Sequence, residues 1–142
     1  MSDFEQTGGC VCGKTRYVLT HEPITIYACH CARCQTRTGS AFGVTMIVPT
    51  AYFQLTGGST EGWLVNVDSR EYVWEKCFEC RTDLYAEIRA TPDIIAVWAG
   101  TFDDVSWIAP KAHIWAKNKQ GWFRFAESDV VYDEQPEDLF SL

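Results

Sequence analysis

Long hydrophobic runs and a leader-like start are both missing from this sequence. It contains no stretch of eighteen apolar residues, which is roughly the minimum for a membrane-spanning helix. The first residues, MSDFEQTGG, lack the basic start and the apolar run of a secretory signal. These absences predict a soluble, cytoplasmic protein with no membrane partner.

Basic residues are also scarce. The chain has 12 Lys and Arg against 19 Asp and Glu, a formal net charge of -7. The last residues, ESDVVYDEQPEDLFSL (127–142), are acidic and contain no Lys or Arg, so the rest of the chain is nearly neutral. A neutral surface does not attract a phosphate backbone, which argues against nucleic acid as a partner. We expect 127–142 to be a solvated acidic tail, apart from a strand or helical turn through Asp129–Tyr132.

No segment sustains the spacing of a long helix, and no repeat or linker divides the 142 residues. Hydrophobic residues make up 46% of the chain, enough for the core of one domain spanning 1–142. Short segments rich in β-branched and aromatic residues predict an all-β fold, with strands in 15–20, 24–29, 41–48, 52–57, 62–67, 71–77, 84–90, 93–100 and 113–117. A turn at 90–93 predicts a hairpin.

Cysteines, in contrast, are abundant and grouped. In a reducing compartment, tight cysteine spacing favours metal ligands over disulfides. Residues i and i+2 of an extended segment face the same side, and a Cys-x-x-Cys turn also brings two sulfurs together. The first and last groups therefore predict a closed structural zinc site made by Cys10, Cys12, Cys77 and Cys80.

The segment CHCARC, residues 29–34, supplies a separate group of three sulfurs. Structural zinc sites usually have four protein ligands, whereas catalytic sites keep one position for water or substrate. We therefore predict that Cys29, Cys31 and Cys34 bind a labile catalytic zinc. A small thiol in the fourth position would lose its proton and could then attack an aldehyde.

Neighbouring residues are candidates for further roles in this reaction. His30 could donate a proton to the alkoxide that forms. Arg33 and Arg37 could bind the carboxylates of a glutathione-like ligand, because a guanidinium group pairs well with a carboxylate.

Three alternatives fit the same residues. His30 or His113 could complete the coordination and make both sites structural, or CHCARC could be spare thiols in a protein with one zinc. The chain could be a zinc-stabilised binding module without chemistry. CHCARC could also be a redox switch that forms a disulfide after zinc loss.

Several motifs occur together and in order between Gly8 and Phe123. They are GGCVCGKTRY, CHCARCQTRTGSAFG, a Cys-x-x-Cys followed by LYAEIRATPDIIAVWAGTFDD, and AHIWAKNKQGWF. In these motifs the chain resembles the glutathione-dependent formaldehyde-activating enzyme (GFA) family, whose relatives include centromere protein V.

The resemblance implies a zinc-binding β-tent fold like that of Mss, with several short antiparallel sheets around the four-cysteine site. It implies structural zinc at the first and last cysteine groups and catalytic zinc at CHCARC. The implied activity is that of a carbon-sulfur lyase of the S-(hydroxymethyl)glutathione synthase type. Its partners would be glutathione or a similar thiol and an aldehyde, and a homo-oligomer is compatible with the sequence.

The chain departs from the family pattern directly after the last cysteine. Family members continue with Gly-Ser/Thr-Pro-Leu, whereas this chain has Arg81, Thr82, Asp83 and Leu84. Because glycine adopts backbone conformations that other residues avoid and proline fixes its own φ, their loss bears on the shape of the zinc-binding turn.

Overall fold

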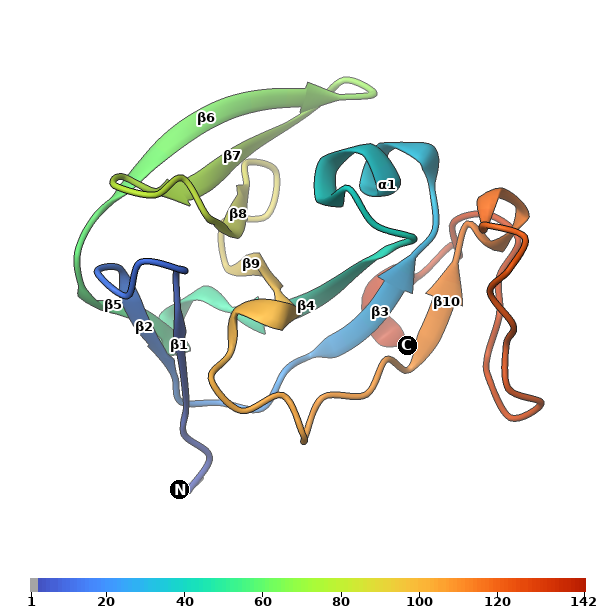
Figure 1. Ribbon diagram of the computed structural model, residues 1–142, viewed down its shortest axis with the longest axis horizontal. Helices are drawn as coiled ribbons and strands as arrows, with labels where there is room; N and C mark the ends of the chain where they lie inside the picture. Colours follow the sequence, from blue (N-terminus) through green and yellow to red (C-terminus); the bar gives the residue numbers. More distant parts are fainter. Residues whose placement is uncertain (1–2) are drawn as a thin grey trace.

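The computed structural model describes residues 3–142, which form ten strands, one α-helix and four short 3-10 helices (Figure 1). The strands are Gln6–Gly9 (β1), Arg16–Leu19 (β2), Thr25–Cys29 (β3), Gly43–Pro49 (β4), Phe53–Gly57 (β5), Thr60–Val67 (β6), Arg70–Cys77 (β7), Asp83–Ile88 (β8), Ile94–Trp98 (β9) and Ala112–Ile114 (β10). The helices are Ala32–Thr38 (α1) and the 3-10 helices Thr50–Tyr52, Ala99–Thr101, Ala116–Asn118 and Leu139–Ser141.

The strands form two sheets. The small sheet has the order β1-β2-β5, and the large one has the order β10-β3-β4-β9-β8-β7-β6. All strand pairs are antiparallel except β10 and β3. Each of the nine predicted strand segments contains a strand, and β8 and β9 form the predicted hairpin. The prediction of a mostly β fold is confirmed.

The large sheet uses its two faces differently, because successive residues of a strand point to opposite sides. Met46 and Val48 of β4 belong to a buried cluster that also contains Tyr17 and Leu19 of the small sheet. A fully buried side chain of this size contributes about 1.5–3 kcal/mol to stability. Ile47, between the two β4 residues, belongs to a second cluster on the other face. This second face forms the floor of the cavity described below.

Helix α1 was not expected, because seven residues are too few to show a helical pattern. It begins directly after Cys31, whose sulfur accepts a hydrogen bond from the backbone N–H of Cys34 at 3.3 Å. It ends at Gly39, whose φ of 67° places it in the left-handed region that glycine tolerates best. Within residues 3–142, no helix is long and apolar enough to cross a membrane.

Strand β1 was also missed, because its glycines give a weak strand signal. Gly8 lies where the backbone approaches two other groups closely. A Cβ atom at this position would lie 2.4 Å from the Tyr17 hydroxyl oxygen and 2.5 Å from the Thr101 carbonyl oxygen. Only glycine fits this position without a shift of its neighbours.

Residues 127–142 are largely exposed but stay in contact with the rest of the fold. Residues 129–132 follow β10, with the N–H of Tyr132 donating to the His113 carbonyl at 2.9 Å and a parallel bridge between His113 and Val131. This is a single bridge and not a strand. Further along, Leu139 and Phe140 turn back against the cavity formed on the large sheet.

Candidate metal centres

The first and last cysteine groups converge on one site. The loop between β1 and β2 carries Cys10 and Cys12, Cys77 is the last residue of β7, and Cys80 lies in the turn between β7 and β8. All four sulfurs lie within 4.8 Å of one another, with 3.4 Å between Cys10 and Cys12 and 3.9 Å between Cys12 and Cys77. Sulfurs that share a tetrahedral zinc at about 2.3 Å lie about 3.8 Å apart. The donor set therefore fits zinc.

The chain donates hydrogen bonds to several of these sulfurs. The buried Thr15 donates from its N–H to Cys10 Sγ at 3.3 Å, and its hydroxyl lies 3.2 Å from Cys77 Sγ. The Thr82 hydroxyl lies 3.0 Å from Cys80 Sγ, and hydrogen bonds from Thr82 lower the pKa of Cys80 to about 5. Metal binding requires such deprotonated sulfurs.

Arg81, at the position where the family has glycine, adopts a φ of 66°. Its N–H donates to the Cys77 carbonyl at 3.0 Å, which closes the turn around the sulfurs. The missing glycine therefore leaves the shape of the turn intact at the cost of a strained residue. The guanidinium group of Arg81 pairs with Glu61 at 2.5 Å on the surface, where an ion pair adds little stability.

The Arg81→Gly protein should be more stable than the Arg81→Ala protein. Both substitutions remove the surface ion pair, but only glycine relieves the left-handed backbone, which is worth about 1 kcal/mol. Thermal and denaturant unfolding of the two zinc-loaded variants measures this difference. Equal stabilities would show that Arg81 is not strained.

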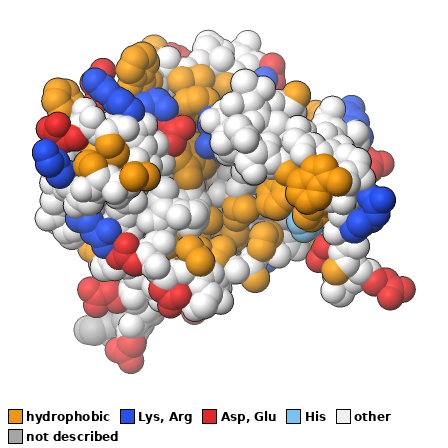
Figure 2. All heavy atoms as spheres, viewed as in Figure 1, with side chains coloured by type: hydrophobic (Ala, Val, Ile, Leu, Met, Phe, Trp, Pro, Cys, Tyr) orange, Lys and Arg blue, Asp and Glu red, His pale blue; other side chains and the backbone are white. Residues whose placement is uncertain are grey.

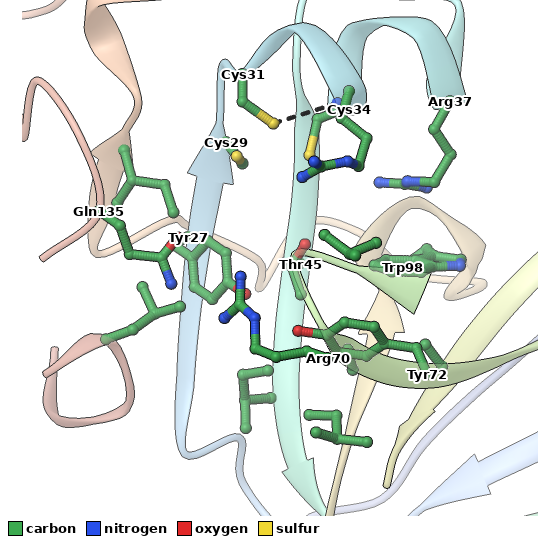
Figure 3. Close-up of a pocket in the computed structure, with 18 of the residues that line it drawn as sticks. Tyr27, Cys29, Cys31, Cys34, Arg37, Thr45, Arg70, Tyr72, Trp98 and Gln135 are labelled. Carbon is green, nitrogen blue, oxygen red and sulfur yellow. Dashed lines mark hydrogen bonds between the residues drawn. The ribbon is translucent and has the colours of Figure 1, made fainter. Parts of the chain in front are cut away.

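The second cluster lies where β3 ends and α1 begins. Cys29 is the last residue of β3, Cys31 caps α1, and Cys34 lies in its first turn. Their three sulfurs lie within 4.8 Å of one another, so this set can also hold a metal ion. Figure 3 shows the three cysteines together at one end of the cavity, with the hydrogen bond from Cys34 to Cys31 drawn as a dashed line.

The three thiols perturb one another. Hydrogen bonds from Cys29 and then Cys34 lower the pKa of Cys31 to about 2. The same hydrogen bond raises the pKa of Cys29, because Cys29 must keep its proton in order to donate it to the thiolate of Cys31. The cluster without a cation therefore favours one thiolate, and a bound cation is needed before all three can ionise.

A fourth protein ligand is absent from this cluster within residues 3–142: neither His30 nor His113 belongs to the group of sulfurs. The closed site with four sulfurs and the open site with three are therefore different in kind. This is the arrangement that distinguishes structural from catalytic zinc sites.

His30 lies away from the cavity and does not contact a reactant there. It is fully buried, its Nε2 lies 2.9 Å from His113 Nδ1, and its ring packs against Phe42, Phe123 and Phe125. Burial, followed by the charge of His113, lowers the pKa of His30 to about 4, so the ring is neutral at neutral pH. This placement argues against the predicted role of His30 as a proton donor. It indicates instead that the His30 side chain supports the loop that carries the three cysteines.

The three sulfurs face a cavity of about 320 Å³. It lies between α1 and the long hairpin β6–β7, which forms the curved end of the large sheet in Figure 1. Hydrophobic side chains gather across the middle of the face that Figure 2 shows. Beneath the cysteines in Figure 3 lie Tyr27, Thr45 and Trp98, with Arg70 and Tyr72 at the far side. A cavity of this size matches a small-molecule site.

The structure brings both predicted arginines to this cavity. Arg37 stacks its guanidinium group 4.0 Å from the centre of the Trp98 ring. Arg33 reaches across the cavity to Asp68 in the β6–β7 turn, at 3.6 Å. Arg70, which the sequence did not single out, is a third basic residue of the wall.

The sequence indicated that tryptophans form core or pocket wall, but not which aromatic residues line this cavity. Tyr27 could have been found, because it lies two residues before Cys29 on the same strand and therefore faces the same side. The residues from β7 and from 135–140 carry no comparable local signal, since they reach the cavity through long-range packing.

Comparison with known proteins agrees with this geometry. The sequence model of the family described as "Glutathione-dependent formaldehyde-activating enzyme" matches residues 5–118. The chain belongs to this GFA family. Both cysteine clusters lie inside the matched region, whereas 119–142 lies outside it.

Two fungal relatives are both named "Putative glutathione-dependent formaldehyde-activating enzyme". The one from Emericella nidulans is 30% identical over 81 residues, which is 56% of this chain and 40% of that protein. The one from Sordaria macrospora is 28% identical over 76 residues, 54% of this chain and 32% of that protein. The match thus covers less than half of either relative.

A solved structure shares the fold. The crystal structure of a Rhodobacter sphaeroides protein superposes with a TM-score of 0.51 and 14% sequence identity, covering 89% of this chain and 98% of the other. At this identity the likeness concerns the fold alone. The predicted family and the mostly β architecture with cysteine clusters suited to zinc are confirmed.

Proposed function

We propose that this GFA-family protein is an enzyme that joins a thiol and an aldehyde at the three-cysteine cluster and also cleaves their adduct, as a carbon-sulfur lyase does. The family name indicates glutathione and formaldehyde as reactants. The observation that supports the proposal is a cluster of three sulfurs that lacks a fourth ligand within residues 3–142 and faces a cavity. The four-cysteine cluster would hold a second, structural zinc.

The reaction needs a deprotonated thiol next to a carbonyl carbon. Zinc held by Cys29, Cys31 and Cys34 would supply the positive charge that favours the thiolate of an incoming thiol. The cavity wall keeps the aldehyde beside that sulfur and limits access of water. A carbon-sulfur bond forms, the carbonyl π bond breaks, and the thiol proton ends on the new hydroxyl oxygen.

The hydroxyl groups of the cavity wall can assist the oxygen that becomes negative. Tyr27 lies on the same face of β3 as Cys29. Burial raises the pKa of Tyr27, so the side chain stays protonated and can donate a hydrogen bond to the alkoxide. We assign this position to Tyr27 in place of His30, whose ring lies outside the cavity.

The arginines of the wall suit the carboxylates of glutathione. Within residues 3–142, Arg37 and Arg70 form no ion pair, and the pair of Arg33 with Asp68 is exposed and long. A guanidinium group free of protein carboxylates can bind a ligand carboxylate through two hydrogen bonds. We propose that Arg33 and Arg37, with Arg70, orient the thiol.

Exchange NMR of glutathione and formaldehyde tests this function. Zinc-loaded wild-type protein should accelerate interconversion of the free reactants and their adduct. Tyr27→Phe should slow this catalysed exchange about tenfold or more while leaving glutathione binding, measured by calorimetry, unchanged. If wild-type protein with both zinc sites filled neither binds a low-molecular-weight thiol nor changes the exchange rate, the proposed function is wrong, and a binding module or redox switch becomes the better hypothesis.

A further inference from the structure

The cavity beside the three sulfurs is more apolar than an adduct of glutathione with formaldehyde requires. Glutathione carries two carboxylates, an ammonium group and two peptide bonds, and formaldehyde adds only one carbon and one oxygen, so neither reactant supplies a large apolar group. The cavity measures about 320 Å³. Its wall is built chiefly from the side chains of Tyr27, Ile47, Val67, Trp74, Ile88 and Trp98.

The charged side chains that line the cavity are all basic. Arg33, Arg37 and Arg70 line it, and no carboxylate does so within residues 3–142. The carboxylates of the thiol can therefore bind at the arginines, whereas its ammonium group finds no carboxylate among the lining residues and stays in solvent. Because a buried polar group without a partner costs free energy, the apolar interior is best occupied by an uncharged, apolar part of the substrate.

The C-terminal segment completes the apolar wall. Leu139 and Phe140 line the cavity although they lie beyond the matched region 5–118. Their position is fixed by contacts further up the segment. The Trp115 indole N–H donates to Gln135 at 3.2 Å, and Lys117 pairs with Glu134 at 2.5 Å.

We propose that the aldehyde used by this protein carries an aryl or branched-alkyl group, and that Leu139 and Phe140 form the part of the cavity that selects for it. The inference rests on the proposed function, because it names the substrate class of that same site. The adduct is a hemithioacetal with the thiol's carboxylates at the arginines and the apolar group between the aromatic wall and the C-terminal segment. The step remains redox-neutral: one carbon-sulfur bond forms, and the thiol proton passes to the former carbonyl oxygen.

Two unreactive thioethers measure the pocket without any turnover. S-benzylglutathione mimics an adduct with an aryl group, and S-methylglutathione mimics the formaldehyde adduct. Fluorescence of Trp74, Trp98 and Trp115, which line the cavity, reports their binding to the zinc-loaded protein. We expect the benzyl compound to bind at least about tenfold more tightly than the methyl compound.

Substitution of the C-terminal wall tests the selectivity. Phe140→Ala should reduce the benzyl-to-methyl affinity ratio about fivefold or more and leave the affinity for S-methylglutathione within about twofold. Tyr52→Ala is the matched control, since Tyr52 has an exposed fraction of 47% against 39% for Phe140 and lies outside this cavity. Leu139→Ala provides a second variant if Phe140→Ala does not fold.

The outcomes separate this inference from the proposed function. A ratio near one in wild-type protein overturns the inference, even if the protein accelerates exchange of glutathione and formaldehyde. A high ratio that neither C-terminal variant lowers overturns the role of the segment. The inference is supported if wild-type protein gives a high benzyl-to-methyl ratio and Phe140→Ala lowers it. If that result is obtained but no aldehyde reacts, the assignment of the pocket stands and the proposed catalytic function fails.

Discussion

The Cys34→Ser protein is expected to exchange glutathione and formaldehyde at least about a hundredfold more slowly than wild type, and to bind one zinc where wild type binds two. A serine hydroxyl has nearly the size of a thiol but stays protonated at neutral pH. Cys29 and Cys31 would then be the remaining sulfurs of the cluster. Metal analysis by native mass spectrometry and exchange NMR measure the two effects.

Thr36→Ala is the control for this substitution, because Thr36 is exposed on α1 and does not line the cavity. It should retain both zinc ions and the wild-type exchange rate. Full activity of Cys34→Ser would contradict an enzyme that works at this cluster. If zinc is instead lost from wild type on mild oxidation, with a disulfide among the three cysteines, the redox switch is the better explanation.

Loss of Cys77 should affect stability more than any other single cysteine substitution. Cys77 is fully buried, and its cluster connects the loop after β1 to the turn after β7, so it joins the two sheets. We expect Cys77→Ser to lower the free energy of unfolding by about 3–5 kcal/mol, less than the full binding energy of zinc because the core is already formed by other contacts. Denaturant unfolding of the purified protein gives this value.

Cys31→Ser is the matched comparison, since it removes a sulfur from the other cluster. It should lower the free energy of unfolding by about 1 kcal/mol or less, because Cys29–Cys34 are close in sequence and their zinc closes only a short loop. A chelator should destabilise wild type to about the level of Cys77→Ser, and it should change Cys77→Ser itself by no more than Cys31→Ser changes wild type. Equal stability of the two cysteine variants would refute separate structural and catalytic roles.

The strands could be predicted because their sequences carry the information locally. Segments such as 24–29 and 94–98 consist mainly of β-branched and aromatic residues, which favour extended backbone. The convergence of Cys10 and Cys12 was also predicted, although the two residues meet in the turn after β1 and not on an extended strand. Sequence spacing alone thus identified both sulfur clusters that the structure assembles.

The parts that were missed depend on contacts between distant segments. Helix α1 is specified by a cysteine cap and Gly39 and not by a hydrophobic stripe. The placement of His30 follows from its partner His113, 83 residues away. Arg70 and Phe140 reach the cavity from opposite ends of the fold, and no spacing rule connects them.

The placement of Phe140 also bears on how proteins with this architecture diversify. The cysteines that could hold metal lie inside the stretch 5–118, whereas part of the cavity wall comes from beyond it. Evolution can therefore replace the terminal segment and recruit the same sulfur chemistry to a new metabolite without disturbing the scaffold. Two homologues with identical cysteine patterns need not process the same compound.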